Sequence, residues 1–404
     1  MSHPAETMVG AAGEDEGTFG TIPVAALIAT SVLAQIGQYG IGFVVLPLWL
    51  MQSSSSAALT GLFASFEWIG MLAGIMLAPS VIGRSGFGRT VFYGLLVSVA
   101  GFCVVAVPAG ALVLPGAGMI GFGMGLRWIG IETPLFRGTP SRMRGRIIGL
   151  HELLVASAAM IGPMFERLTG LVGVRPLMWG VLFVLAAMLS LIVGVRWSPM
   201  SGTMDSGGAA GTVRRTSLSS TMRTGAMIGA TAGLCNGALY GLLPQFAHAR
   251  AMTPEMTSSL LVNAGIGAAL AQYPVGWLAD RLGLTHSAIL LGSISLISST
   301  VLLVARLPAT LMLAVLIFAG VIRALLTLAT YAAAIDDAGS ADHNMRVVAG
   351  RFSVGAILGP IGAGTAMSVA GMNMLAVWFI ALCGGLTLYL CSTVLPFMPR
   401  RSKP

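Results

Sequence analysis

The chain has 404 residues, of which 56% are hydrophobic and only 9% are charged. Soluble globular proteins carry about 25% charged residues. The composition therefore excludes a soluble enzyme and predicts a chain in a lipid bilayer, where one helical span needs about 20 apolar residues. The net charge is +8, but no basic stripe with interleaved aromatic residues accompanies it, so we expect no nucleic-acid partner.

The amino-terminal residues 1–20 are acidic and contain no lysine or arginine. A secretory signal begins with a positive region, so we expect this stretch to be a retained cytoplasmic tail. The four cysteines lie within apolar runs and form no C-x-x-C motif. We therefore expect no metal site and no cofactor.

Apolar runs separated by breakers predict an all-α integral membrane protein with twelve transmembrane helices. We expect two pseudo-symmetric six-helix bundles over 21–197 and 224–397, a cytoplasmic linker over 198–223, and a basic cytoplasmic tail over 398–404. The first six helices are expected near 22–50, 57–82, 89–108, 110–136, 147–169 and 174–196, and the other six near 224–247, 256–279, 286–306, 308–335, 346–370 and 373–396.

The two halves repeat each other in sequence. Gly86 and Gly283 are 197 positions apart, Arg127 and Arg323 are 196 apart, and the Gly-Pro pairs that begin at Gly162 and Gly359 are again 197 apart. Duplicated halves are typical of transporters whose binding site lies between the repeats.

The loop charges give the orientation of the chain. The loops on one side hold only Arg167, Arg175, Arg250 and Arg306, and the other loop arginines fall on the side of the termini. Because positive loops stay in the cytoplasm, we expect both termini there. The expected location is the bacterial inner membrane.

One loop carries a recognisable motif. The stretch Gln272–His286 reads Q-Y-P-V-G-W-L-A-D-R-L-G-L-T-H. Its Gly276, Asp280, Arg281 and Gly283 resemble the G-x-L-(A/S)-D-R-x-G signature of the major facilitator superfamily. The resemblance implies a gating motif in which Asp280 meets the start of the fifth helix, near Arg144 or Arg146.

Further stretches are similar to a bacterial subgroup of that superfamily whose members are mostly uncharacterised. Residues 121–136 resemble its fourth helix, Arg144 and Arg146 its next loop, and residues 352–364 its eleventh helix. The chain departs from the subgroup at Arg127, where the subgroup usually has an apolar residue.

Ionisable residues inside spans are costly and are functional candidates by default. Arg127 and Arg323 lie about 15 and 18 Å from the cytoplasmic ends of their helices, at a rise of about 1.5 Å per residue. Two guanidinium groups facing one cavity would bind a carboxylate or phosphate. The alternative is that each arginine only braces its own bundle.

Three carboxylates are candidates for proton coupling. Glu67 lies near the middle of the second helix, and Glu132 and Glu152 lie nearer the cytoplasmic side. A buried carboxyl can bind and release a proton as its surroundings open and close. The alternatives are a static pair between Glu67 and Arg127, and an inner gate formed by Glu132 and Glu152.

Uncharged polar residues complete the candidate substrate site. They are Gln35, Gln38 and Tyr39 on the first helix and Asn236 and Tyr240 on the seventh. Such residues also serve as hydrogen-bonding contacts between helices, so the alternative is a purely structural role.

Together these patterns predict a secondary active transporter of a small organic solute, possibly anionic, that works by alternating access with proton coupling. We expect a monomer whose partners are the solute, protons and the lipid bilayer. No ATP-binding motif is present, so a gradient must drive transport. The alternatives are an exporter of hydrophobic drugs and a non-transporting relative that acts as a receptor or assembly factor.

Overall fold

The computed structural model describes residues 21–52, 56–107, 110–137, 141–197, 218–336 and 341–394. These residues form helices joined by short turns. The two predicted tails and nearly all of the predicted linker lie outside the described residues.

The first half is built from a broken first helix followed by five longer ones. Its elements are α1 (Thr21–Gln35), the π-helix η1 (Ile36–Val45), α2 (Leu46–Gln52), α3 (Ala57–Ser85), α4 (Phe87–Ala106), the 3₁₀ turn η2 (Gly110–Leu112), α5 (Val113–Arg137), α6 (Ser141–Thr169) and α7 (Arg175–Trp197). The α1, η1 and α2 segments run on without a gap and form one span.

The second half repeats this order with one extra break. Its elements are α8 (Ser220–His248), α9 (Pro254–Leu270), α10 (Gln272–Val304), α11 (Pro308–Ile335), α12 (Ala341–Ala370) and α13 (Met374–Val394). The predicted eighth helix, 256–279, is divided at Ala271 between α9 and the start of α10. The ninth follows a non-helical residue inside α10, Gly283.

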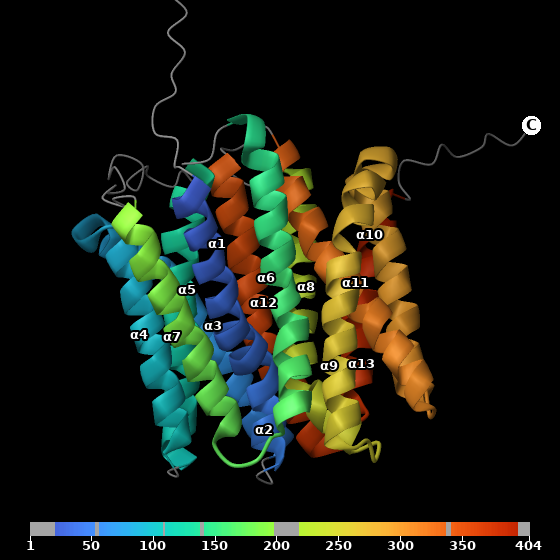
Figure 1. Ribbon diagram of the computed structural model, residues 1–404. Coiled ribbons are helices and arrows are strands. Elements are labelled where there is room, and N and C mark those ends of the chain that lie inside the picture. The colour runs from blue at the N-terminus through green and yellow to red at the C-terminus, as the bar shows by residue number, and fades with distance from the viewer. Residues whose placement is uncertain are drawn as a thin grey trace, which may run out of the picture.

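Among the described residues, ten helical segments are long and apolar enough to cross a membrane. Two further helices correspond to the other two predicted spans: α6, which is 29 residues long, and α9, which is 17 residues long. At about 1.5 Å per residue, α6 is long enough to cross a bilayer, and Figure 1 shows it running the height of the bundle. The helices follow the predicted order.

The repeat is visible in the backbone. Gly86 ends α3 at φ 78° and ψ 169°, and Gly283, 197 positions later, has φ 74° and ψ 169°. A side chain would strain this backbone, which explains glycine at both turns. Ser56 caps α3 and Thr253, again 197 positions later, caps α9. Matching turns and caps at one offset identify the halves as copies of one unit.

The halves meet through two matched pairs of helices. In the first pair α3 packs against α12, and in the second α6 packs against α9, as Figure 1 shows for α6 and α9. The offset relates α3 to α9 and α6 to α12, so each contact is the symmetry copy of the other. The interface therefore has the two-fold character expected of a duplicated protein.

Within each half, glycines let helices touch backbone to backbone. A Cβ on Gly121 of α5 would lie 1.8 Å from the carbonyl oxygen of Glu67 on α3. Lipid gives helices no hydrophobic reason to associate, so such close contacts carry much of the packing. The contact also fixes the position of Glu67.

Candidate functional site

Arg127 on α5 is held entirely within the first half. The side chain is only 3% exposed. Its Nε donates to Gln38 Oε1 at 2.7 Å, its Nη1 donates to Ser31 Oγ at 3.2 Å, and its Nη2 donates to Gln35 Oε1. These contacts satisfy a buried guanidinium with neutral oxygen acceptors, which lowers the cost of holding the charge in the membrane.

The Arg127 cluster extends across four spans. Gln38 Nε2 donates to Ser98 Oγ on α4 at 2.7 Å, and Ser98 donates to the carbonyl oxygen of Ile120 on α5 at 3.2 Å. His151 Nε2 on α6 lies 2.9 Å from Ser31 Oγ. The hydrogen bonds therefore join the first span, α4, α5 and α6 around one charge.

Arg323 on α11 is placed differently. The side chain is partly exposed, and among the described residues its guanidinium makes no hydrogen bond and no ion pair. Two phenol groups, Tyr39 on η1 and Tyr240 on α8, lie within electrostatic range of it. The Arg323 guanidinium therefore has no hydrogen-bond acceptor among the described residues, whereas that of Arg127 has three side-chain acceptors.

The repeat explains the difference. The residues 197 positions after Ser31, Gln35 and Gln38 are Ile228, Ala232 and Cys235. All three are fully buried in the core of the second half. The second half therefore lacks the acceptors that hold Arg127, and its arginine has no equivalent cluster.

Glu67 on α3 is a buried carboxyl. It is 0% exposed, and neither of its oxygens has a hydrogen-bond partner among the described residues. Its Oε1 faces Gly42 of η1, where a Cβ would lie 3.5 Å away, and Tyr39 is within its electrostatic range. The static pair between Glu67 and Arg127 is not formed in this structure. An ionised carboxylate without partners is very costly in such a site, so the neutral form is favoured here.

The structure thus divides the predicted substrate residues into two groups. Gln35 and Gln38 contact Arg127, so they belong to the cluster in the first half. Tyr39 lies near Asn236, Arg323 and Glu67, and its ring meets that of Tyr240 at 5.9 Å. We call these five residues, Tyr39, Glu67, Asn236, Tyr240 and Arg323, the central cluster.

The predicted gate residues are described only in part. Glu132 lies within electrostatic range of Arg127. The side chains of Glu152, Arg144 and Arg146 lie outside the described parts of α6. In the loop motif, Asp280 is exposed and the Arg281 guanidinium lies 4.1 Å from the centre of the Trp277 ring. Gly276 is exposed and Gly283 forms the turn.

Sequence reasoning missed two features of the site. Ser31, Gln35 and Gln38 are spaced i, i+4 and i+7, so they share one helical face, and this spacing already indicated a common partner. The second feature is a row of aromatic rings, described below, which links residues far apart in sequence.

The two halves are joined at one end of the molecule. Among the described residues, four hydrogen bonds cross between the halves toward this end, and Tyr39 and Asn236 share a further one nearer the middle of their spans. The four join Ala58 with Ser368, Ser65 with Ile357, Arg167 with Ser259, and Gln245 with Thr60. Most of these residues lie near the start of α3 and α9 or near the end of α6, α8 and α12. We call these four contacts the seal.

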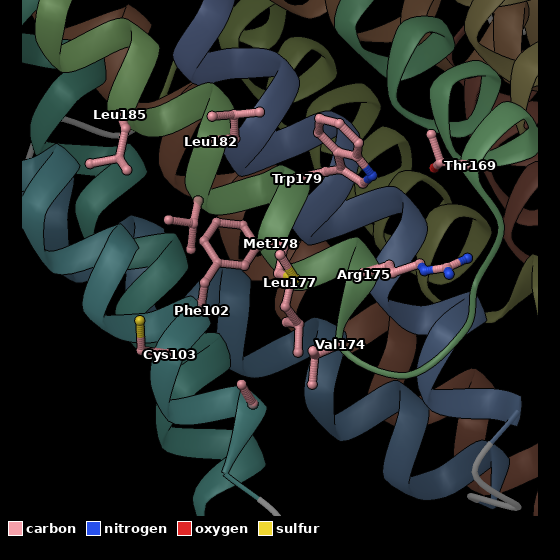
Figure 2. Close-up of a pocket in the computed structure, with 12 residues that line it drawn as sticks. Phe102, Cys103, Thr169, Val174, Arg175, Leu177, Met178, Trp179, Leu182 and Leu185 are labelled. Atoms are coloured by element: carbon pink, nitrogen blue, oxygen red, sulfur yellow. The ribbon is translucent and has the colours of Figure 1, made fainter.

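A separate groove of about 820 Å³ lies between α4 and α7. Figure 2 shows that its walls are apolar side chains such as Phe102, Leu182 and Leu185, with Cys103 at one edge. Exposed apolar side chains on a membrane span face lipid tails. We therefore assign this groove to acyl chains, and it contains no residue of the central cluster.

Known proteins with similar sequences bear on the function of this chain. No protein-family model matches the chain. Proteins named as uncharacterised MFS-type transporter YcaD, from Escherichia coli strains UMN026 and HS, are 28% and 27% identical over 295 residues. These matches cover 69% of this chain and 73% of each relative.

Solved transporter structures share the fold. A mutant of the nucleoside transporter NupG has a TM-score of 0.73 at 11% identity, covering 92% of this chain and 99% of its own. A bacterial homologue of the human lysosomal transporter Spinster has a TM-score of 0.70 at 13% identity, covering 94% and 100%. Relatives and structures together confirm a membrane transporter rather than an enzyme. The chain is therefore similar, over most of its length, to proteins named as transporters of the major facilitator type, and it shares the fold of solved transporters.

Proposed function

We propose that this transporter carries a small organic anion and couples its movement to protons. Arg323 binds the anionic group of the solute, and Glu67 binds the coupling proton. The observation that supports this is the central cluster, in which an unpaired guanidinium from the second half and an unpaired buried carboxyl from the first half share one neighbour, Tyr39.

The coupling follows from the charge states of these two groups. A neutral Glu67 leaves the positive charge of Arg323 uncompensated, which favours the arrival of an anion. When the site opens to the other side, water reaches Glu67 and the carboxyl can ionise. The new negative charge then competes with the solute for Arg323. Proton release and solute release are therefore linked.

Alternating access uses the two bundles, 21–197 and 224–397, as moving bodies. The seal closes one end, and rocking must break its four hydrogen bonds while new contacts close the other. We propose that the end opposite the seal faces the cytoplasm, because the loop arginines gather on that side. The monomer in a bacterial inner membrane is the functional unit in this proposal.

The direct test is Glu67→Gln in proteoliposomes. The amide is close in size, and no hydrogen bond of Glu67 to a described residue is lost. We expect solute exchange to continue while a pH gradient no longer drives accumulation. Glu255→Gln is the control, because it removes an exposed carboxyl in the first turn of α9 and leaves the central cluster intact. Unchanged coupling in Glu67→Gln would remove Glu67 from the mechanism.

A second test concerns the seal. A Cβ on Gly61 of α3 would lie 2.3 Å from the carbonyl oxygen of Pro360 on α12. Gly61→Val should therefore keep the sealed end open and stop net transport. Gly83→Val on the same helix is the control, since nothing lies within 4 Å of a Cβ there. Accessibility of engineered cysteines at the sealed end provides the readout, and equal labelling in both variants would contradict the assignment.

A further inference from the structure

A row of aromatic rings crosses the boundary between the halves beside the central cluster. It begins at Tyr240 of α8, which meets Tyr39 at 5.9 Å between ring centres. Tyr39 stacks on Phe43 at 5.6 Å, Phe43 meets the edge of Trp68 at 5.2 Å, and Trp68 meets Phe352 of α12 at 5.8 Å. Five rings from four spans thus form one continuous set.

The row is only partly core: Phe43 and Trp68 are buried in a hydrophobic cluster, and Tyr39 and Phe352 pack against it. Only 7% of the residues in the chain are aromatic, yet these five gather where the two halves meet. Tyr39 and Phe352 remain partly exposed although both lie deep within their spans. The phenols of Tyr39 and Tyr240 lie within electrostatic range of the Arg323 guanidinium.

A guanidinium beside a row of aromatic rings selects a solute for two properties, a negatively charged group and an aromatic ring. Arginine binds planar carboxylates through paired hydrogen bonds. Aromatic rings prefer other rings in stacked or edge-to-face contact, at centre distances like those seen within the row. A carboxylate on a flat aromatic ring can bind the guanidinium and also stack on the row. A carboxylate on a saturated ring can bind only the guanidinium.

We propose that the solute of this transporter is a planar aromatic or heteroaromatic anion, with its charged group on Arg323 and its ring against Tyr39 and the row that continues to Phe352. This inference rests on the proposed function and narrows its substrate class. The row then contributes ring selectivity, and Arg323 contributes charge selectivity.

Three matched probes separate these contributions. Benzoate carries both features, cyclohexanecarboxylate keeps the charge without the aromatic ring, and benzamide keeps the ring without the charge. Titration calorimetry on the full chain in lipid nanodiscs measures each affinity. We expect benzoate to bind about tenfold more tightly than cyclohexanecarboxylate, since one or two ring contacts supply about this factor. Benzamide should bind at least about tenfold more weakly than benzoate, because it lacks the charge that Arg323 recognises.

Variants assign the ring preference to the row. Tyr39→Leu should weaken benzoate toward the affinity of cyclohexanecarboxylate and leave cyclohexanecarboxylate nearly unchanged, while Tyr39→Phe should retain most of the preference. The matched control is Phe165→Leu, which removes a ring from a separate aromatic group with Trp179 and Phe183. That variant should keep the full preference for benzoate.

Failure of this inference differs from failure of the proposed function. Equal binding of benzoate and cyclohexanecarboxylate, both lost in Arg323→Gln, would overturn the aromatic assignment and leave anion transport standing. A preference for benzoate that survives Tyr39→Leu would also overturn it. Absence of binding by either acid would overturn this inference, and transport that does not depend on Arg323 would overturn the proposed function itself.

Discussion

Arg127 and Arg323 occupy equivalent places in the two halves, yet their surroundings differ completely. Arg127 donates to three side chains of its own half and is almost fully buried. Arg323 has no such partner among the described residues and is partly exposed. A duplicated protein can thus keep the same charged residue twice and use one copy for stability while the other remains free for a ligand.

The largest expected effect comes from replacing Arg127, the arginine that is held by side chains of its own half. Arg127→Met would leave Gln35 Oε1 and Gln38 Oε1 buried without a donor, at about 1–3 kcal/mol for each. We expect a clear fall in the melting temperature of the purified protein, measured by fluorescence-detected size exclusion after heating. The fraction that stays folded should bind solute normally. An unchanged melting temperature would show that the cluster does not brace this half.

The second effect, of intermediate size, concerns binding rather than stability. Arg323→Gln removes a charged hydrogen-bond donor that has no protein partner to lose. Hydrogen bonds to charged groups contribute about 1.5–3 kcal/mol, so anion affinity should fall by about 10- to 150-fold. The melting temperature without solute should match that of the wild type. A large loss of stability would mean that Arg323 is also a brace.

The smallest expected effect is a difference in stability between substitutions of two serines at equivalent positions in the two halves. Ser98→Ala removes the acceptor for Gln38 Nε2 and should lower stability by about 1 kcal/mol. Its repeat mate is Ser295, 197 positions later, whose hydroxyl donates only to the Leu291 carbonyl of its own helix. Ser295→Ala should therefore have almost no effect. Equal losses in the two thermal unfolding curves would contradict the asymmetry between the halves.

Much of the fold followed from sequence because membrane spans have a strong and simple signal. Runs of apolar residues gave the number and order of helices, and the 197-residue offset revealed the duplication through Gly86 and Gly283. The break at Ala271 was missed, although Pro274 three residues later has no N–H to donate to the carbonyl of Leu270 and so marks it. The π-helical geometry of η1 was missed because the glycines there also fit an ordinary α-helix.

The candidate site was less predictable, since it depends on which residues meet across helices. The sequence indicated Arg127 and Arg323 as a pair, but only three-dimensional contacts reveal that the first arginine is satisfied by Gln35 and Gln38. The partners of Tyr39 lie on other spans, so no local pattern could indicate them. Burial of Glu67 was expected, whereas its lack of a partner among the described residues was not.

The π-helix η1 has a consequence for how this protein tolerates change. Its ten residues carry Gln38, which contacts Arg127, and both Tyr39 and Phe43, which belong to the row of rings. Removing one residue from 36–45 would rotate the remainder of the first span about its axis relative to the residues before it, which would misplace one of these two sets. We therefore expect insertions and deletions in this stretch to be far more damaging than point substitutions. The length of the stretch should matter more than the identity of most of its residues.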